Sequence, residues 1–273
     1  MADHPKKRFL HSSSRSFLGR SGHGLLIALT YLFLWVPIIV LLVFSFNTEG
    51  FPSPWKGFTW HWYKELIHSV YLWKAFSNSL IVALSSTLIS VLMSIFLIFF
   101  ATQGGKVGRY LSLFYGSIII PETVLAVSLL GFFSLVSISL GLTTLIVGHT
   151  VLGLGYVIPI VYARFLELDY RLTEASLVLG ATPIQTFFKV TLPLLRPSLI
   201  TSALLIFIIS FDDFILTYFC AGSSVQTLSL YILSMIRSGV SPVVNALSAL
   251  LLFISSLMAL IYFNLNSRSK ISL

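Results

Sequence analysis

Three acidic residues lie inside long apolar stretches of this 273-residue chain: Glu122, which follows Pro121, and the adjacent Asp212 and Asp213. A carboxylate in a segment apolar enough to enter lipid is costly, so it usually marks a partner, a path or a water-filled cavity. The same stretches hold no Lys or Arg that could neutralise the acids, whereas a passing polycation could supply the charges. The acids therefore predict a path for a cationic substrate. The alternative is that one Asp caps a helix break or bonds the backbone.

A second group of polar residues follows a fixed spacing within residues 164–196, in surroundings that are otherwise apolar. Glu174-Ala175-Ser176 is followed after three residues by Gly180, and nine residues later by Val190-Thr191-Leu192-Pro193. Lipid cannot solvate such a segment, so it must either line a cavity or leave the bilayer.

Helix signals at both ends indicate that this polar segment is folded. Thr173 can cap a helix that begins at Glu174, and Gly180 suits the left-handed conformation that closes such a helix. Thr182-Pro183-Ile184-Gln185 is a second start signal, in which Thr and Gln can cap each other's backbone. The sequence thus predicts two short helices around a glycine elbow.

The second of these helices should end at Pro193 and Pro197 and lead into the next apolar stretch. Several apolar side chains of the two helices are expected to be exposed at least in part, namely those of Leu177, Val178, Ile184 and Phe187. They would need either the groove of a partner or a place beneath the chain's own helix bundle. Helix capping and apolarity alone do not decide between the two.

The other reactive residue types show no arrangement for catalysis or metal binding. Cys220 is the single cysteine, and the six histidines show no close-spaced pattern of metal ligands. Gly104-Gly105-Lys106 lacks the earlier glycine of a phosphate-binding loop and is followed by Val107. We expect no enzymatic reaction, cofactor or metal in this chain itself. For His149, inside an apolar stretch, a helix-packing hydrogen bond is favoured over a place in a cavity wall.

The elements that must position these residues are membrane-spanning helices. A composition with 56% hydrophobic and 10% charged residues and a mean hydropathy of +0.95 is typical of an all-α integral membrane protein. Six apolar stretches are each long enough to cross a bilayer. They are residues 24–46, 75–102, 110–136, 142–163, 197–219 and 243–263. The third contains Glu122, and the fifth is interrupted by Asp212 and Asp213.

Basic residues are distributed unevenly between the loops. Thirteen Lys and Arg lie in one set of loops and four in the other, which predicts that both termini and residues 164–196 are cytoplasmic. The net charge of +8 is then a topology signal rather than a sign of nucleic-acid binding. This predicts a cytoplasmic basic N-terminus (1–23), a transmembrane domain (24–267) and a cytoplasmic tail (268–273). The first apolar stretch is expected to be an uncleaved span.

The outward segment between the first two spans, residues 47–74, is rich in Trp and Tyr. Such rings favour the lipid headgroup layer, so the segment is expected to anchor an interfacial helix. The alternative is an aromatic surface for a solute or an outer partner.

The spacing from Glu174 to Pro193 resembles the cytoplasmic EAA loop of permease subunits of ABC importers. That pattern is Glu-Ala-Ala, three residues, Gly, nine residues, Ile, one residue, Leu-Pro, and this chain departs from it at Ser176 and Val190. The resemblance implies a type I (MetI-like) permease fold and coupling to a separate ATPase dimer, which uses the ATP. The implied coupling residues are Glu174, Ala175, Ser176, Gly180, Ala181, Thr182, Pro183, Leu192 and Pro193. Among them, Glu174 would be held by a basic residue of the ATPase.

Three further segments resemble spermidine/putrescine permeases of the PotC type. They are Pro121-Glu122, Ser210-Phe211-Asp212-Asp213-Phe214 and residues 231–248. The resemblance implies a bacterial inner-membrane protein that works with a second homologous permease and an extracytoplasmic substrate-binding protein. Permeases for iron, thiosulfate or phosphonates are relatives and remain alternatives. An ion-coupled carrier or a channel is less favoured, because the EAA spacing is present and no inverted repeat is visible.

Overall fold

The computed structural model of the chain describes residues 16–50, 53–237 and 242–271. Within these ranges the protein is built of helices, and extended backbone pairs only in an isolated bridge between Asn47 and Phe58. The chain divides into two compact units, residues 1–68 with 239–273, and residues 69–238. Residues 1–15 of the predicted basic N-terminus and 272–273 of the predicted tail lie outside the described residues, whereas residues 16–23 and 268–271 are helical.

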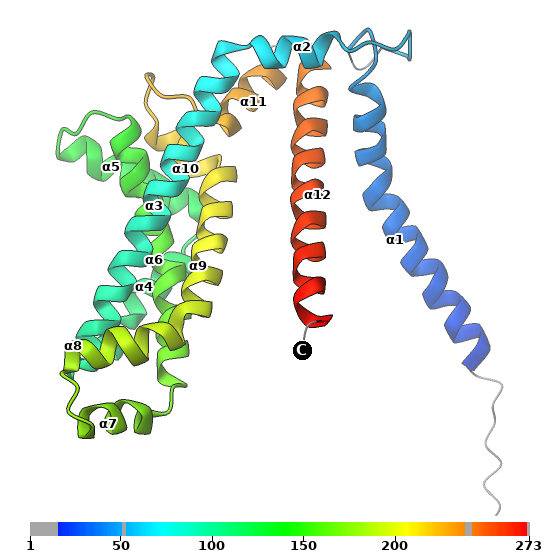
Figure 1. Cartoon of the computed structure of the whole chain (residues 1–273). Helices are drawn as coiled ribbons and strands as arrows, with labels where there is room; N and C mark the ends of the chain where they lie inside the picture. Colours follow the sequence, from blue (N-terminus) through cyan, green and yellow to red (C-terminus); the bar gives the residue numbers. More distant parts are fainter. Residues whose placement is uncertain (1–15, 51–52, 238–241, 272–273) are drawn as a thin grey trace, which may run out of the picture. The chain divides into compact units, whose positions relative to one another are not determined.

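The first unit contains three helices in its described part. They are α1 (Ser16–Phe44), α2 (His61–His68) and α12 (Pro242–Ile271) (Figure 1). The rings of Phe46, Phe58, Trp60 and Tyr63 pack together around the start of α2, with centroids of Phe46 and Trp60 5.0 Å apart. The predicted helix between the first two spans therefore exists as α2, and its place at the membrane surface stays a prediction.

Buried Asn47 fixes the turn that follows α1. Its amide nitrogen donates to the carbonyl oxygens of Glu49 (2.8 Å) and Pro54 (3.2 Å), and its amide oxygen accepts from the backbone N–H of Lys56 (2.9 Å). The ion pair of Lys56 with Glu49 (2.7 Å) is exposed and contributes little stability. The Asn47 side chain thus supports the turn together with backbone hydrogen bonds, among them Thr48 N–H to the Gly57 carbonyl oxygen and Thr59 N–H to that of Phe46.

The second unit contains the remaining helices. They are α3 (Val70–Thr102), α4 (Leu111–Ile119), α5 (Glu122–Leu135), α6 (Leu142–Leu166), α7 (Tyr170–Val178), α8 (Pro183–Thr186), α9 (Leu192–Asp212), α10 (Ile215–Cys220) and α11 (Leu228–Arg237), with short turns of other helix types between some of them. The central helix is α6, which packs against α3, α4 and α9. In Figure 1, α7 lies at one end of this unit and α5 and α10 at the other.

Small residues bring α3 and α6 close together. A Cβ atom at Gly153 would lie 2.5 Å from the hydroxyl oxygen of Ser90, and Ser90 and Ser94 are both fully buried. Close approach of this kind is how helices associate in lipid, where the hydrophobic effect cannot drive them together. It gives the second unit a tightly packed centre.

Several predicted spans have different boundaries in the structure. Among the described residues, four helical segments are long and apolar enough to cross a membrane, and the pair α4–α5 makes a fifth if it counts as one span. The four are Gly24–Phe44, Val70–Thr102, Leu142–Leu166 and Pro183–Asp212. The described apolar part of α12, Pro242–Leu257, is shorter, so the six-span count and the N-in, C-in topology stay predictions.

The predicted span over residues 110–136 is not a single unbroken helix. The helix stops at Ile119, resumes at Glu122, and the two pieces are bent by 106°. Pro121 has no N–H to donate and disfavours a helical conformation in the residue before it, and Ile120 is indeed extended (φ −69°, ψ 131°). Glu122 is therefore the first residue of a helix rather than a residue in the middle of one.

Candidate functional site

Residues 164–196, here called the polar loop, contain the helix α7, which begins earlier than predicted. Asp169 is its N-cap and accepts a hydrogen bond from the backbone N–H of Arg171 (3.0 Å), so Thr173 is not the cap. Asp169 has the extended backbone that an N-cap needs, and the acceptor on its short side chain makes it as good a cap as Thr. Glu174 consequently lies one turn inside α7, where its side chain is exposed.

The glycine elbow after α7 has the predicted conformation. Gly180 has φ +88°, and the next N–H, that of Ala181, donates to the carbonyl oxygen of Ser176 (3.2 Å). Thr182 and Gln185 form a reciprocal capping box: each side-chain oxygen accepts from the other residue's backbone N–H, at 3.0 and 3.3 Å. The predicted helix end at Gly180 and the predicted helix start at Thr182–Gln185 are both confirmed.

A direct side-chain contact sets the angle of the elbow. The hydroxyl groups of Ser176 on α7 and Thr186 on α8 are hydrogen-bonded at 3.0 Å, and Thr186 is buried. Ser176 is one of the two departures from the EAA pattern, and its hydroxyl makes a bond that alanine could not.

The second helix does not end at Pro193 and Pro197, as the sequence predicts. Helical backbone runs without interruption from Pro183 to Asp212, and a π-helical turn, Phe187–Thr191, lies in front of Pro193. In that turn the N–H of Leu192 bonds the carbonyl of Phe187. The wider turn accommodates Pro193, which has no N–H to donate, without breaking the helix. The elbow and Asp212 are thus the two ends of one helix.

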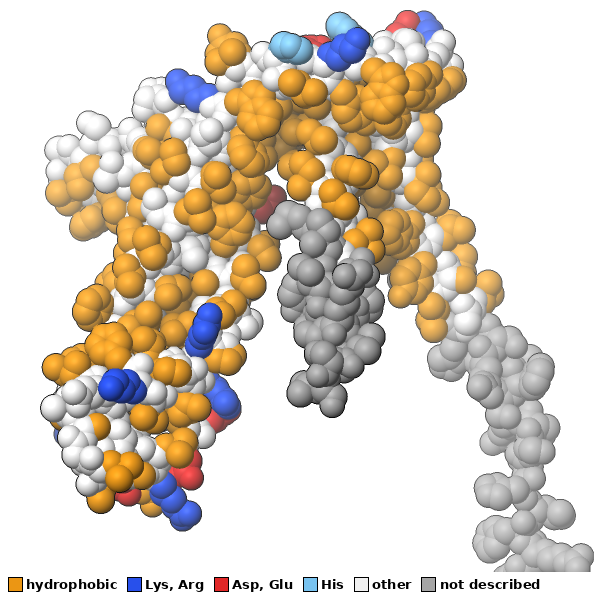
Figure 2. Space-filling model, in the orientation of Figure 1, with side chains coloured by type: hydrophobic (Ala, Val, Ile, Leu, Met, Phe, Trp, Pro, Cys, Tyr) orange, Lys and Arg blue, Asp and Glu red, His pale blue; other side chains and the backbone are white. Residues whose placement is uncertain are grey.

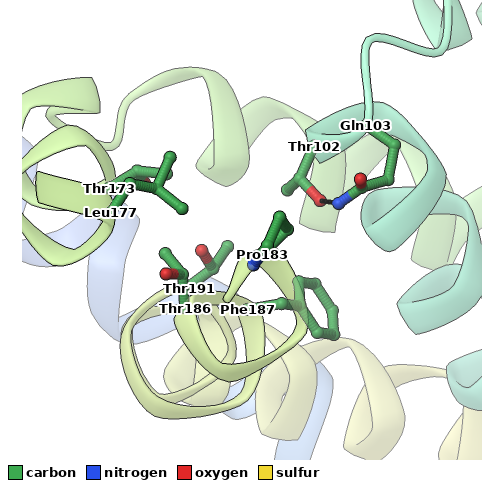
Figure 3. A pocket seen from close by; sticks show the side chains of 8 residues that line it. All are labelled: Thr102, Gln103, Thr173, Leu177, Pro183, Thr186, Phe187 and Thr191. Atoms are coloured by element: carbon green, nitrogen blue, oxygen red, sulfur yellow. Dashed lines mark hydrogen bonds between the residues drawn. The ribbon is translucent and has the colours of Figure 1, made fainter. Parts of the chain in front are cut away.

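One face of the polar loop packs against the end of α3 (Figure 3). Between them lies a cavity of about 110 Å³. It is lined by Thr102, Gln103, Thr173, Leu177, Pro183, Thr186, Phe187 and Thr191. Phe187 is buried, with its ring 5.1 Å from that of Phe99, so the expectation that Phe187 is exposed is wrong.

The opposite face of the loop carries exposed apolar side chains. Val178 and Leu179 are each 87% exposed, and Ile184 is 58% exposed. Charged side chains gather around α7, whereas the helix flanks of the same unit are mostly hydrophobic (Figure 2). Part of the loop therefore packs beneath its own bundle, and the rest presents apolar groups beside Glu174. Apolar groups on such a projection are typical of a surface that a partner covers.

The acidic residues gather where α9 ends. Asp213 is buried in extended backbone (φ −62°, ψ 132°) between α9 and α10. Its carboxylate accepts from the backbone N–H of Thr217 (2.9 Å) and of Leu216 (3.4 Å), and from the hydroxyl of Thr217 (3.1 Å). Asp213 therefore caps α10, which is the alternative that the sequence left open for one member of the pair.

Asp212 has the opposite surroundings. It is the last residue of α9 and is exposed, and its carboxylate makes no hydrogen bond or ion pair within the described part of the chain. Neighbouring residues thus have different tasks, because Asp213 is satisfied by protein donors and Asp212 is available to a ligand.

Glu122 completes the cluster from a third element. Glu122 is the first residue of α5 and is half-buried, and its side chain lies beside that of Asp213. Glu122 also lines a cavity of about 210 Å³ at the α4–α5 bend, where the polar side chains of Ser117 and Tyr156 contribute as well. The helix breaks at Pro121 and Asp213 bring two acids together that lie far apart in the sequence.

His149 is a member of this cluster that the sequence did not assign to it. Its ring bonds the hydroxyl groups of Ser210 and Thr217, as a helix-packing histidine would, and its Nε2 lies 3.6 Å from Asp213 Oδ2. The expectation from the sequence considered only Lys and Arg as neighbours of the acids, so it did not place this imidazole beside Asp213. A histidine in the middle of an apolar stretch was the available signal.

Comparison with known proteins defines the class of protein. Residues 72–270 match the family "Binding-protein-dependent transport system inner membrane component". The chain belongs to this family, so it is an inner-membrane permease component of an ABC importer, a class that works with an ATPase and a substrate-binding protein.

Polyamine permeases are among its relatives. It is 36% identical over 247 residues to the spermidine/putrescine transport system permease protein PotC of Escherichia coli K12, covering 89% of this chain and 93% of that protein. It is 34% identical over 229 residues to PotC of Haemophilus influenzae, covering 82% and 88%. It is 29% identical over 255 residues to the putrescine permease PotI of Escherichia coli K12, covering 90% of each. These relatives are transport subunits.

Solved structures support the fold. A bacterial ABC transporter involved in the import of alginate matches with a TM-score of 0.70 at 15% identity, covering 94% of this chain and 99% of that one. The MetNI methionine ABC transporter matches with a TM-score of 0.53 at 22% identity, covering 76% and 95%. The MetI-like permease fold and the membrane location predicted from the sequence are confirmed.

Proposed function

We propose that this chain forms, with a second homologous permease, the path of an ATP-driven importer for polyamines such as spermidine and putrescine. The observation that carries the proposal is the acidic cluster. Glu122, Asp212 and Asp213 are the acids of the apolar stretches, and one of them, Asp212, has no protein partner among the residues that the structure describes. The names of the PotC and PotI relatives support the same substrate class.

Polyamines suit this cluster chemically. An alkylammonium group has three N–H donors and a full positive charge, and its hydrogen bonds to carboxylates are charge-assisted. Asp212 would receive one ammonium group. A second could replace the contact between Glu122 and Asp213, where each side chain has acceptor oxygens, while the methylene chain of the polyamine lies along the apolar helix surfaces.

The polar loop would couple this path to ATP hydrolysis. We expect one subunit of an ATPase dimer to enclose the exposed face of the loop, with a basic residue on Glu174 and an apolar groove over Val178, Leu179 and Ile184. A substrate-binding protein would deliver the polyamine on the outer side. When the ATPase pair closes on ATP, the loop would move as a unit because its elbow is held by the capping box and by the Ser176–Thr186 bond.

The test is polyamine uptake by the assembled transporter in proteoliposomes. Asp212→Asn keeps the shape of the side chain and removes the charge. Losing a hydrogen bond to a charged group costs about 1.5–3 kcal/mol, so we expect KM for spermidine to rise about 10- to 150-fold. Glu122→Gln should reduce uptake as well. The matched control is Glu65→Gln, which removes an exposed acid on α2, outside the cluster.

Each alternative predicts a different result. Unchanged uptake in both Asp212→Asn and Glu122→Gln would rule out the cation path. Uptake of iron, thiosulfate or a phosphonate, with no uptake of polyamine, would assign another solute to the same class of permease. Uptake without ATP would favour an ion-coupled carrier.

A further inference from the structure

His149 joins three helices at the acidic cluster. It lies on α6 with 1% of its surface exposed, and each ring nitrogen faces a hydroxyl group from a different helix. Nδ1 is 3.1 Å from Ser210 Oγ on α9, and Nε2 is 3.3 Å from Thr217 Oγ1 on α10. The two contacts lie on either side of the break that holds Asp213, so the imidazole bridges that break.

The direction of the hydrogen bonds follows from the number of hydrogens. The hydroxyl of Thr217 has a single hydrogen and donates it to Asp213, whose Oδ2 is 3.1 Å away and whose carbonyl oxygen is 3.3 Å away. The Thr217 oxygen can then only accept from His149, so Nε2 carries a hydrogen. The chain of donors therefore runs from His149 through Thr217 to the Asp213 carboxylate.

Through Nδ1 and Ser210, the ring is also connected to α3. Ser210 Oγ, next to Nδ1, is also 3.1 Å from Ser86 Oγ, and both serines are buried. Ser86, Ser210, His149, Thr217 and Asp213 thus form one row of hydrogen-bonded side chains. Because buried polar groups are costly when they lose a partner, each member of this row restricts the positions of the others.

We propose that His149 is a positioning residue of the cation site: through Thr217 it holds the Asp213 carboxylate on the end of α10, so that Asp212 is the acid presented to the substrate. Without this hold the α9–α10 break could relax, and neither carboxylate would keep a fixed position. The inference rests on the proposed function, because Asp212 is taken as the acid that meets the cation.

Replacing His149 by glutamine or by asparagine distinguishes the roles of its two ring nitrogens. In His149→Gln the amide nitrogen can take the place of Nε2 and keep the bond to Thr217, whereas in His149→Asn it reaches only the place of Nδ1. For spermidine uptake by the assembled transporter, we expect His149→Gln to keep KM within about threefold and His149→Asn to raise it about tenfold. A role in helix packing alone would not distinguish the two variants in this order.

A second pair of variants tests the relay through Thr217. Thr217→Val keeps the side-chain shape but removes the hydroxyl, so it should raise KM as His149→Asn does. Thr87→Val is the matched control, since the buried hydroxyl of Thr87 has no hydrogen-bond partner within the described part of the chain. This control should leave KM unchanged.

A measurement without polyamine separates this inference from the proposed function. In an Asp212→Cys variant of the assembled complex the new thiol is exposed, whereas the one native cysteine, Cys220, is fully buried. We expect labelling by a cationic methanethiosulfonate reagent to slow at least about fivefold when His149→Asn or Thr217→Val is added. Labelling of a Glu65→Cys variant should not change.

Three results would overturn the inference. They are equal KM values for His149→Gln and His149→Asn, labelling of the Asp212→Cys thiol that ignores both second changes, and loss of complex assembly in both His149→Asn and Thr217→Val, which would make the row purely structural. If the labelling follows our expectation but polyamine is not transported, the positioning role stands and the substrate assignment fails.

Discussion

Replacing Gly180 by alanine tests whether the polar loop must keep its elbow in order to bind the ATPase. Gly180 has φ +88°, and a Cβ built on it would meet no atom within 4 Å. The only penalty of Gly180→Ala is therefore backbone strain, about 1–2 kcal/mol for an L-residue in the left-handed region. No steric clash complicates the result.

The hydrogen bonds of the elbow set the scale for this strain. Two bonds of the capping box and the Ser176–Thr186 bond contribute about 1 kcal/mol each, or about 3 kcal/mol together. The strain offsets a third to two-thirds of that stabilisation, so the free loop can relax in part. Docking would have to restore the strained elbow, and the affinity for the ATPase should fall by up to about 5- to 30-fold.

The assay is titration of the ATPase subunit onto the permease pair in lipid nanodiscs. Gly131→Ala is the first control, because Gly131 lies inside α5 without positive φ and its added Cβ also meets nothing within 4 Å. Gly104→Ala is the second, since it brings the same strain (φ +86°) outside the EAA spacing. If Gly180→Ala bound the ATPase as tightly as Gly131→Ala, the elbow would not be part of the docking surface and the reasoning would be refuted.

Two further predictions concern the loop and the first unit. Glu174→Arg should abolish copurification of the ATPase, whereas Glu167→Arg, an exposed acid of the same loop, should not; retention of the ATPase by the first variant would contradict the assigned role of Glu174. Asn47→Ala removes three hydrogen bonds of a buried side chain, which should cost about 3 kcal/mol and speed tryptic cleavage at Lys56, whereas an unchanged cleavage rate would show that Asn47 does not hold this turn.

Local signals in the sequence predict the elbow well. A left-handed glycine and a Thr-Pro-x-Gln helix start depend on a few neighbouring residues, and both Gly180 and the Thr182–Gln185 box have the predicted geometry. The prediction that α7 begins at Glu174 is wrong because the local signals there are ambiguous. Asp169 and Thr173 are both competent caps, and sequence alone does not show which one the backbone uses.

The acidic cluster shows what a linear reading cannot supply. The sequence marks Glu122, Asp212 and Asp213 as unusual because apolar stretches seldom contain acids. Their arrangement depends on two helix breaks and on the packing of α5 and α6 against the α9–α10 break, none of which is encoded in local spacing. The same holds for His149, whose partners Ser210 and Thr217 are distant in sequence.

The wrong prediction that a helix ends at Pro193 and Pro197 has the largest consequence for the proposed coupling. Pro193 and Pro197 look like the end of a helix, so the sequence separates the loop from the span that carries Asp212. A π turn at Phe187–Thr191 instead keeps the backbone helical through 30 residues, from Pro183 to Asp212. At 1.5 Å per residue this helix is about 45 Å long. If the loop couples to an ATPase as proposed, a displacement of the elbow would reach the acidic cluster through a single element, and the π turn and Pro197 are the points at which that element can bend.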